Sequence, residues 1–225
     1  MHYEIVHAGQ SRSFPEPHAF LEQAAPRGEA LFYLGADAGY AYSNGQGHES
    51  RVFVAVELGT ECLGFHTGES RGKEGSNVVG FARFRLGEAD PSPLVELVRQ
   101  PGTTAAAIEA AKAVFKAAGL VVAVCNDFPG RIVDRLIRPY FNAALRRLDE
   151  KLASADDLDK TLCLGLGYPE GPISLLERTG LAHHCHVTQA LHEALGQEPY
   201  APARRARVAA QREERAEVCV QRALP

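Results

Sequence analysis

The chain has 225 residues, of which 45% are hydrophobic and 23% are charged, the balance of an ordinary soluble globular protein. This length allows one large domain or two small ones, with a core that needs neither metal nor disulfides. The formal net charge of -4 excludes a general attraction for nucleic acid or for an anionic membrane. The longest apolar stretch, residues 120–125, is too short to cross a bilayer.

The cysteines are scattered and form no CxxC pair. They are Cys62, Cys125, Cys163, Cys185 and Cys219. Their odd number and wide spacing favour reduced thiols over a disulfide framework or a zinc ribbon. The N-terminus shows no basic-then-apolar signal pattern. We therefore expect a cytoplasmic protein.

The first part of the chain is expected to be rich in strands. Short β-branched or aromatic runs between turn residues predict strands at 3–7, 30–34, 52–58 and 78–81. Between the first two strands, residues 16–25 are compatible with one helix, whereas 40–50 and 66–77 are turn-rich and predict loops. An Ala-rich helix capped by Thr103-Thr104 is expected to end at Ala118, before a buried strand at 120–125.

After residue 127 the pattern is helical. Apolar residues recur as adjacent pairs every four positions from Ile132 to Leu148, which gives a helix one broad apolar face. The polar residues expected on the opposite side are Arg131, Asp134, Arg135, Arg138, Asn142 and Arg146. Pro139 predicts a kink in this helix. Further helices are expected from Ser154 and at 171–179, 181–196 and 203–217. We place the domain boundary so that 1–125 and 126–225 form two domains.

Residues 126–145 read N-D-F-P-G-R-I-V-D-R-L-I-R-P-Y-F-N-A-A-L. This segment resembles D-x-P-G-F-I-V-N-R-L-L-x-P-Y-x-N-E-A, the opening of the C-terminal domain of 3-hydroxyacyl-CoA dehydrogenases. The likeness continues through 153–159, through L-G-L-G-Y-P-E-G-P-I-S-L-L at 164–176, and through Gly180-Leu181. Upstream, residues 77–84 resemble the family strand V-I-G-M-H-F-F-N-P. The resemblance implies an α/β domain followed by an all-α domain, a reduced Rossmann-like domain plus the C-terminal helical domain, as in the second module of long members.

The dinucleotide fingerprint of the family, G-x-G-x-x-G, is absent. Residues 4–13 hold one glycine, and Gly35-Ala-Asp-Ala-Gly39 is too short and wrongly spaced. Without those glycines the backbone cannot approach a pyrophosphate. The N-terminal part is also expected to be too short for the usual six-stranded sheet. We therefore expect no cofactor, and NAD only if the chain is active.

The catalytic positions implied by the resemblance are also changed. Ala82 stands where the family has its basic His, and an alanine cannot accept a proton. Glu96 matches the orienting Glu, with two extra residues between them, and Asp134 replaces an Asn near the substrate oxygens. The family's Ser falls near Thr60. His66, in the loop 64–68, is the candidate substitute base, and a solvated loop histidine is the other interpretation.

Three further motifs have a structural interpretation beside a functional one. His183-His184-Cys185-His186 contains zinc-ligand types, but only His192 follows at helical spacing, so we expect no metal. The glycines of 165–171 indicate a connecting turn, because no strand precedes them. A C-terminal basic stretch predicts a solvated helix face, or a contact to coenzyme A phosphates or to an adjoining module. It consists of Arg204, Arg205, Arg207, Arg212 and Arg215.

Three functions stay open. The first is a non-catalytic dimerisation or accessory module of a 3-hydroxyacyl-CoA dehydrogenase, in fatty-acid or aromatic acyl-CoA degradation. The second is active NAD-dependent oxidation of a 3-hydroxyacyl-CoA with an unusual base, and the third is a standalone acyl-CoA-binding protein. The apolar face of 132–148 favours the first, because one small domain can hardly bury it. The expected partner is a second copy, through the helical domain, or a catalytic dehydrogenase module, and neither nucleic acid nor membrane.

Overall fold

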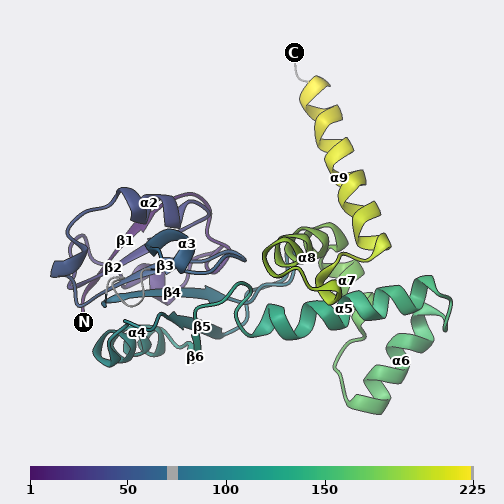
Figure 1. The fold of residues 1–225 in the computed structure, drawn as a ribbon, viewed down its shortest axis with the longest axis horizontal. Helices are drawn as coiled ribbons and strands as arrows, with labels where there is room; N and C mark the ends of the chain where they lie inside the picture. The colour runs from purple at the N-terminus through teal and green to yellow at the C-terminus, as the bar shows by residue number, and fades with distance from the viewer. Residues whose placement is uncertain (70–75, 224–225) are drawn as a thin grey trace. The chain divides into compact units, whose positions relative to one another are not determined.

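The computed structural model describes residues 1–69 and 76–223 and divides the chain into two compact units (Figure 1). The first, the sheet unit, consists of Met1–Arg85 and Asp90–Val133. The second, the helical unit, consists of Leu86–Ala89 and Asp134–Pro225. The short stretch Leu86–Ala89 belongs to the helical unit, where the backbone N–H of Glu88 donates to the carbonyl of Thr179 (3.2 Å).

A six-stranded sheet forms the centre of the sheet unit. Its strands are β1 (Tyr3–His7), β2 (Ala30–Leu34), β3 (Phe53–Glu57), β4 (Val78–Arg83), β5 (Leu94–Arg99) and β6 (Val121–Asn126). They lie side by side in chain order; β1 to β4 are parallel, β5 is antiparallel to β4, and β6 is parallel to β5. The expectation that this part is too short for six strands is wrong, because residues 78–126 supply three of them.

Helices cover both faces of the sheet (Figure 1). The helices on one face are α1 (Ala19–Glu22) and α4 (Ala105–Ala117), and those on the other are α2 (Ala38–Asn44) and α3 (Gly64–Thr67). Neighbouring strand residues point to opposite faces, so Phe32 packs with Phe20 and Phe115, whereas Tyr33 belongs to the other core. Burial on both faces explains why β2 and β3 are apolar along almost their whole length.

Two local expectations for the sheet unit need correction. Residues 40–50 are not simply a loop, since α2 runs to Asn44 and a 3₁₀ turn follows at His48–Ser50. The ring of Tyr42 stacks on that of His48, with centroids 4.7 Å apart, so tertiary contacts stabilise a helix that local propensity does not predict. In the stretch 16–25 only the four residues of α1 are helical. Of the loop expected at 66–77, α3 takes the first two residues and 70–75 lie outside the described residues.

The helical unit is built from α5 (Val133–Asp149), α6 (Ala155–Leu166), α7 (Pro172–Thr179), α8 (Leu181–Leu195), a 3₁₀ turn (Glu198–Tyr200) and α9 (Arg204–Ala223). Their bounds follow the expected ones closely, because the start and stop signals are local. The Ser154 hydroxyl accepts the N–H of Asp157, and Gly167 ends α6 in the left-handed conformation. No helix of the described residues is long and apolar enough to span a membrane.

The polar side of α5 is buried. It contains Asp134, Arg138 and Asn142, while on the apolar side Leu136 is 72% exposed and Phe141 and Leu145 are buried. Hydrogen bonds between these polar side chains and the rest of the helical unit make their burial possible. The apolar pattern alone therefore does not tell which side of α5 faces the interior of its own unit.

Candidate functional site

Ala82 and Glu96 are direct partners across the antiparallel pair of β4 and β5. Directly opposite residues of an antiparallel pair project their side chains from the same face of the sheet. Both are buried, with exposures of 4% and 2%. The two positions that correspond to the family's His and Glu are therefore neighbours in space, although the side chain that would take a proton is missing.

The carboxylate of Glu96 contacts backbone N–H groups and a guanidinium group. Its Oε1 accepts the backbone N–H groups of Ile132 and Val133, each at 2.8 Å, and its Oε2 lies 3.4 Å from Nε of Arg131. A carboxylate at the first turn of a helix satisfies N–H groups that lack partners within the helix. Glu96 thus serves as the N-terminal cap of α5.

Arg131 stands where the family motif has a phenylalanine. It adopts a φ of +50°, in the left-handed region that side chains rarely enter, and it is 7% exposed. Its Nη1 has no hydrogen-bond partner among the described residues. A buried ion pair with Glu96 compensates the charge of the guanidinium. This pair occupies the carboxylate that a dehydrogenase would use to orient its base.

The position near the family's Ser lies against the same turn. The carbonyl of Thr60 accepts the backbone N–H of Gly130 at 2.8 Å, which joins the chain after β3 to the turn before Arg131.

The candidate substitute base, His66, has a carboxylate neighbour: its Nε2 lies 3.3 Å from Oε1 of Glu61. The ring of His66 packs closely on Gly39, where an added Cβ would lie 2.0 Å from its Cε1. His66 is therefore a mostly buried α3 residue with a carboxylate partner, which the sequence did not predict.

At the carboxyl ends of β1 to β3, Glu57 accepts three hydrogen bonds. The donors are the backbone N–H of Gly35 (2.7 Å), the backbone N–H of Ser13 (2.8 Å) and the hydroxyl of Ser11 (3.0 Å). Dinucleotides bind outside the carboxyl ends of parallel strands where the strand order reverses. The order of these strands has no reversal, and the carboxylate of Glu57 already takes the N–H groups that converge at their ends. The residues present do not fit NAD.

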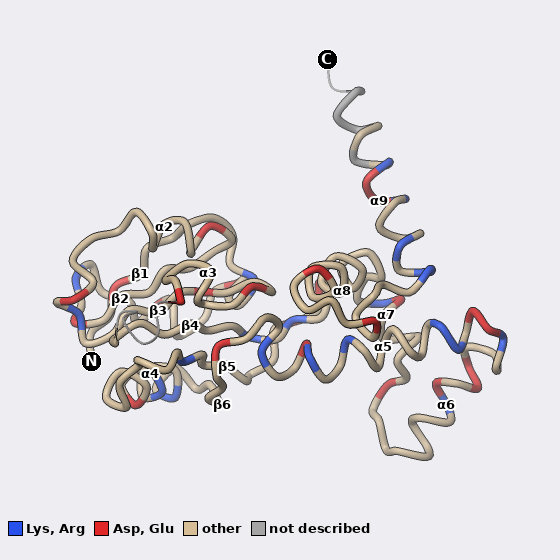
Figure 2. Tube along the Cα trace, in the orientation of Figure 1, with Lys and Arg blue, Asp and Glu red and all other residues tan. Residues whose placement is uncertain are grey.

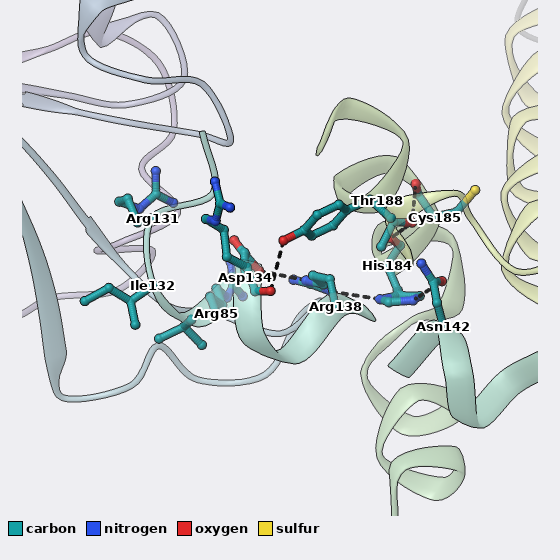
Figure 3. A network of polar contacts seen from close by, with 12 residues as sticks. Arg85, Arg131, Ile132, Asp134, Arg138, Asn142, His184, Cys185 and Thr188 are labelled. Atoms are coloured by element: carbon teal, nitrogen blue, oxygen red, sulfur yellow. Dashed lines mark hydrogen bonds and ion pairs between the residues drawn. The ribbon is translucent and has the colours of Figure 1, made fainter. Parts of the chain in front are cut away.

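Asp134 belongs to a different group of contacts, within the helical unit (Figure 3). Its Oδ1 accepts Nε of Arg138 at 2.7 Å; Nη1 of Arg138 lies 3.2 Å from Nδ1 of His184, and Nε2 of His184 lies 3.1 Å from Oδ1 of Asn142. Because Arg138 can only donate, Nδ1 accepts and Nε2 carries the hydrogen. Burial, with the charges of Arg138 and His183, lowers the pKa of His184 to about 3. The negative charge of Asp134 is thus compensated by Arg138, inside the fold.

Two of the remaining motifs make contacts within the helical unit. No group of three or more His, Cys, Asp or Glu residues is placed there to hold a metal, and His184 is fully buried in the network. Arg204 and Arg205 both donate to Asp149, at 3.0 and 2.6 Å. Figure 2 shows basic residues at the start of α9 and acidic ones further along it.

A six-stranded, mostly parallel sheet unit followed by a helical unit defines an α/β domain followed by an all-α domain. Residues 130–218 match the C-terminal domain of 3-hydroxyacyl-CoA dehydrogenase. This helical part of the chain belongs to the 3-hydroxyacyl-CoA dehydrogenase family.

The chain is also similar to individual dehydrogenases in sequence and in structure. The 3-hydroxybutyryl-CoA dehydrogenase of Bradyrhizobium diazoefficiens is 38% identical over 48% of this chain and 37% of its own length. The mitochondrial hydroxyacyl-coenzyme A dehydrogenase of Homo sapiens is 37% identical over 47% of this chain and 34% of its own length. The (S)-3-hydroxybutyryl-CoA dehydrogenase of Ralstonia eutropha is similar in structure, with a TM-score of 0.67 and 25% identity over 81% of this chain and 66% of that one. The sequence match spans about a third of these two curated relatives.

Proposed function

We propose that this chain is a non-catalytic dimerisation or accessory module of the 3-hydroxyacyl-CoA dehydrogenase family. The observation that carries the proposal is Glu96: it lies opposite Ala82, which has no ionisable group, and it is bound by Ile132, Val133 and Arg131. Oxidation of a 3-hydroxyl group needs a base that takes the hydroxyl proton. The carboxylate of Glu57, which takes the N–H groups of Ser13 and Gly35 beyond the strand ends, supports the same conclusion.

The surface of α5 and α6 supports a role in association. Asp159 is the one buried residue of α6, although the helix has an apolar side. Its Leu164 is 81% exposed and its Leu166 65% exposed, and Leu136 of α5 adds a third exposed leucine. A 12-residue helix is marginal in water without packing, so a partner that covers the apolar side of α6 would stabilise it. We propose a second copy of the chain as the partner, with a catalytic dehydrogenase module as the alternative.

The test of the catalytic proposal is an assay of purified chain 1–225 with NADH and acetoacetyl-CoA. The expected result is no turnover above the background of buffer alone and no change of NADH fluorescence on mixing. A dehydrogenase of the same family with its His and G-x-G-x-x-G intact serves as the positive control. Turnover by the purified chain would overturn the proposal.

The pair of His66 and Glu61 favours a second candidate, an active dehydrogenase with a substitute base. A histidine beside a carboxylate is the chemical form of the family's own dyad, and here the two are 3.3 Å apart. If the chain has activity, His66→Gln is expected to abolish it, whereas His186→Gln on α8 is expected to leave it unchanged. For either candidate function we propose a cytoplasmic location. All five cysteines are free, as is usual in a reducing compartment.

A further inference from the structure

Glu57 lies at the end of β3 and is 6% exposed. Its Oε1 accepts the backbone N–H of Ser13 and the hydroxyl of Ser11, and its Oε2 accepts the backbone N–H of Gly35. We name Ser11, Ser13 and Gly35 the donor cradle. The three donors come from the chain after β1 and after β2, so the cradle joins the ends of three neighbouring strands.

The donors of the cradle are held in place by the surrounding backbone. Gly35 has a φ of +120°, and a Cβ there would lie 2.3 Å from the carbonyl oxygen of Ala8, so only glycine brings this N–H so close to the β1 loop. On the other side, Arg83 donates from Nη1 to the carbonyl of Ser13 (2.8 Å), and its backbone N–H donates to the Ser13 hydroxyl (3.1 Å). These contacts do not involve Glu57, so the cradle keeps its shape without that side chain.

Backbone N–H groups and a hydroxyl that converge beyond the carboxyl ends of parallel strands are a donor set for oxyanions. The ligand in this chain is a carboxylate that the chain supplies itself. A second oxyanion cannot enter, because Glu57 takes the donors and its charge repels a phosphate.

We propose that the donor cradle is an oxyanion-binding site whose ligand is Glu57, and that a free oxyanion binds there when this side chain is shortened. This inference rests on the proposed function and deepens it. It names the Glu57 carboxylate as the group that keeps nucleotide phosphates out of the sheet unit. Phosphate binding is measured directly and needs no catalytic activity. Its failure can therefore be distinguished from a failure of the proposed function in the dehydrogenase assay.

The experiment compares wild-type chain with Glu57→Ala, Glu57→Gln and Glu16→Ala by calorimetry and thermal unfolding in inorganic phosphate and in acetate. Glu57→Ala opens the cradle, and we expect it to bind phosphate at least about tenfold more tightly than the wild type, and acetate to raise its unfolding temperature. Glu57→Gln removes the charge but still fills the space, so it is expected not to bind. Glu16 is exposed in the loop after Ser13, and Glu16→Ala removes an equal charge outside the cradle.

A folded Glu57→Ala variant that binds neither anion would overturn the proposal. Equal phosphate affinity in the Glu57→Ala and Glu16→Ala variants would do the same, because it would reduce the effect to net charge. If Glu57→Ala folds only when phosphate or acetate is present, the proposal is supported, since the anion then replaces the missing carboxylate. If it stays unfolded in both anions, the proposal fails.

Discussion

Ala82 and Glu96 face each other across two antiparallel strands, yet the carboxylate of Glu96 is bound by the main chain at the start of α5. The resemblance assigns this position to the residue that orients a catalytic base. In this chain its carboxylate binds Ile132, Val133 and Arg131.

Replacing Glu96 by glutamine is expected to destabilise the chain. The amide keeps the volume of the side chain but leaves the buried charge of Arg131 without its counter-ion, which costs about 3 kcal/mol in comparable cases. Urea unfolding followed by circular dichroism measures the change. Glu109→Gln, on the exposed side of α4, is the control and should change the free energy of unfolding by less than about 0.5 kcal/mol. Equal effects of the two substitutions would show that Glu96 has no special role.

His184 is expected to make the helical unit sensitive to acid. Its pKa is lowered from 6.5 to about 3 in the folded chain, so below pH 6.5 the unfolded chain binds a proton that the folded chain refuses. The stability that depends on neutral His184 is complete above pH 6.5 and is lost as the pH falls toward 3. At pH 5 the loss amounts to about 2 kcal/mol relative to pH 7.

Free energies of unfolding between pH 7 and pH 4 measure this effect. The variant His184→Gln, which has no titrating ring, should lack this part of the pH dependence, although it is less stable at pH 7. The control is His186→Gln, on the exposed side of the same helix, which should follow the wild-type curve. If His184→Gln and wild type lose stability in parallel on acidification, the neutral buried imidazole is not responsible.

Leu164→Asp is expected to weaken the proposed self-association. The side chain is 81% exposed in the single chain, so the substitution should leave the fold intact while it places a charge in the proposed apolar interface. Light scattering over a concentration series should show a dimer for the wild type and a dissociation constant raised at least about tenfold for the variant. Val208→Asp, at an exposed position of α9, is the matched control. A wild-type chain that is monomeric at every concentration would contradict the proposed interface.

The order and bounds of most helices and strands could be predicted because their signals are local. Thr104 caps α4 at the expected place, Gly196 follows α8, and β1 and β2 have the expected bounds. The helix α2 was missed, since what stabilises it is contact with residues near 48. The burial of the polar side of α5 could not be predicted, because hydrogen-bonding partners such as His184 lie more than forty residues away.

The candidate site was predicted only as a set of positions. Sequence motifs identify Ala82, Glu96 and Asp134, since each stands in a recognisable pattern. The contacts of the site could not be predicted, because they depend on distances in the folded chain: Arg131 beside Glu96, Glu61 beside His66, and the donors around Glu57. The one available signal was Arg131, a charged residue in place of an aromatic one just before an apolar helix. Its buried ion pair follows only from the fold, which brings Arg131 to 3.4 Å from Glu96 of β5.

The sheet in which every strand lies beside its predecessor in the chain also has a consequence for how the protein is made. During synthesis each new strand can add to the edge of the strands that have already emerged from the ribosome. The neighbour of β1 is β2, the next strand to be synthesised. Sequential pairing keeps the loops that must close short, which favours fast folding. In a nascent chain stopped after β4, all four strands of the parallel part would have their neighbours, while α4, which covers one face, would still be missing.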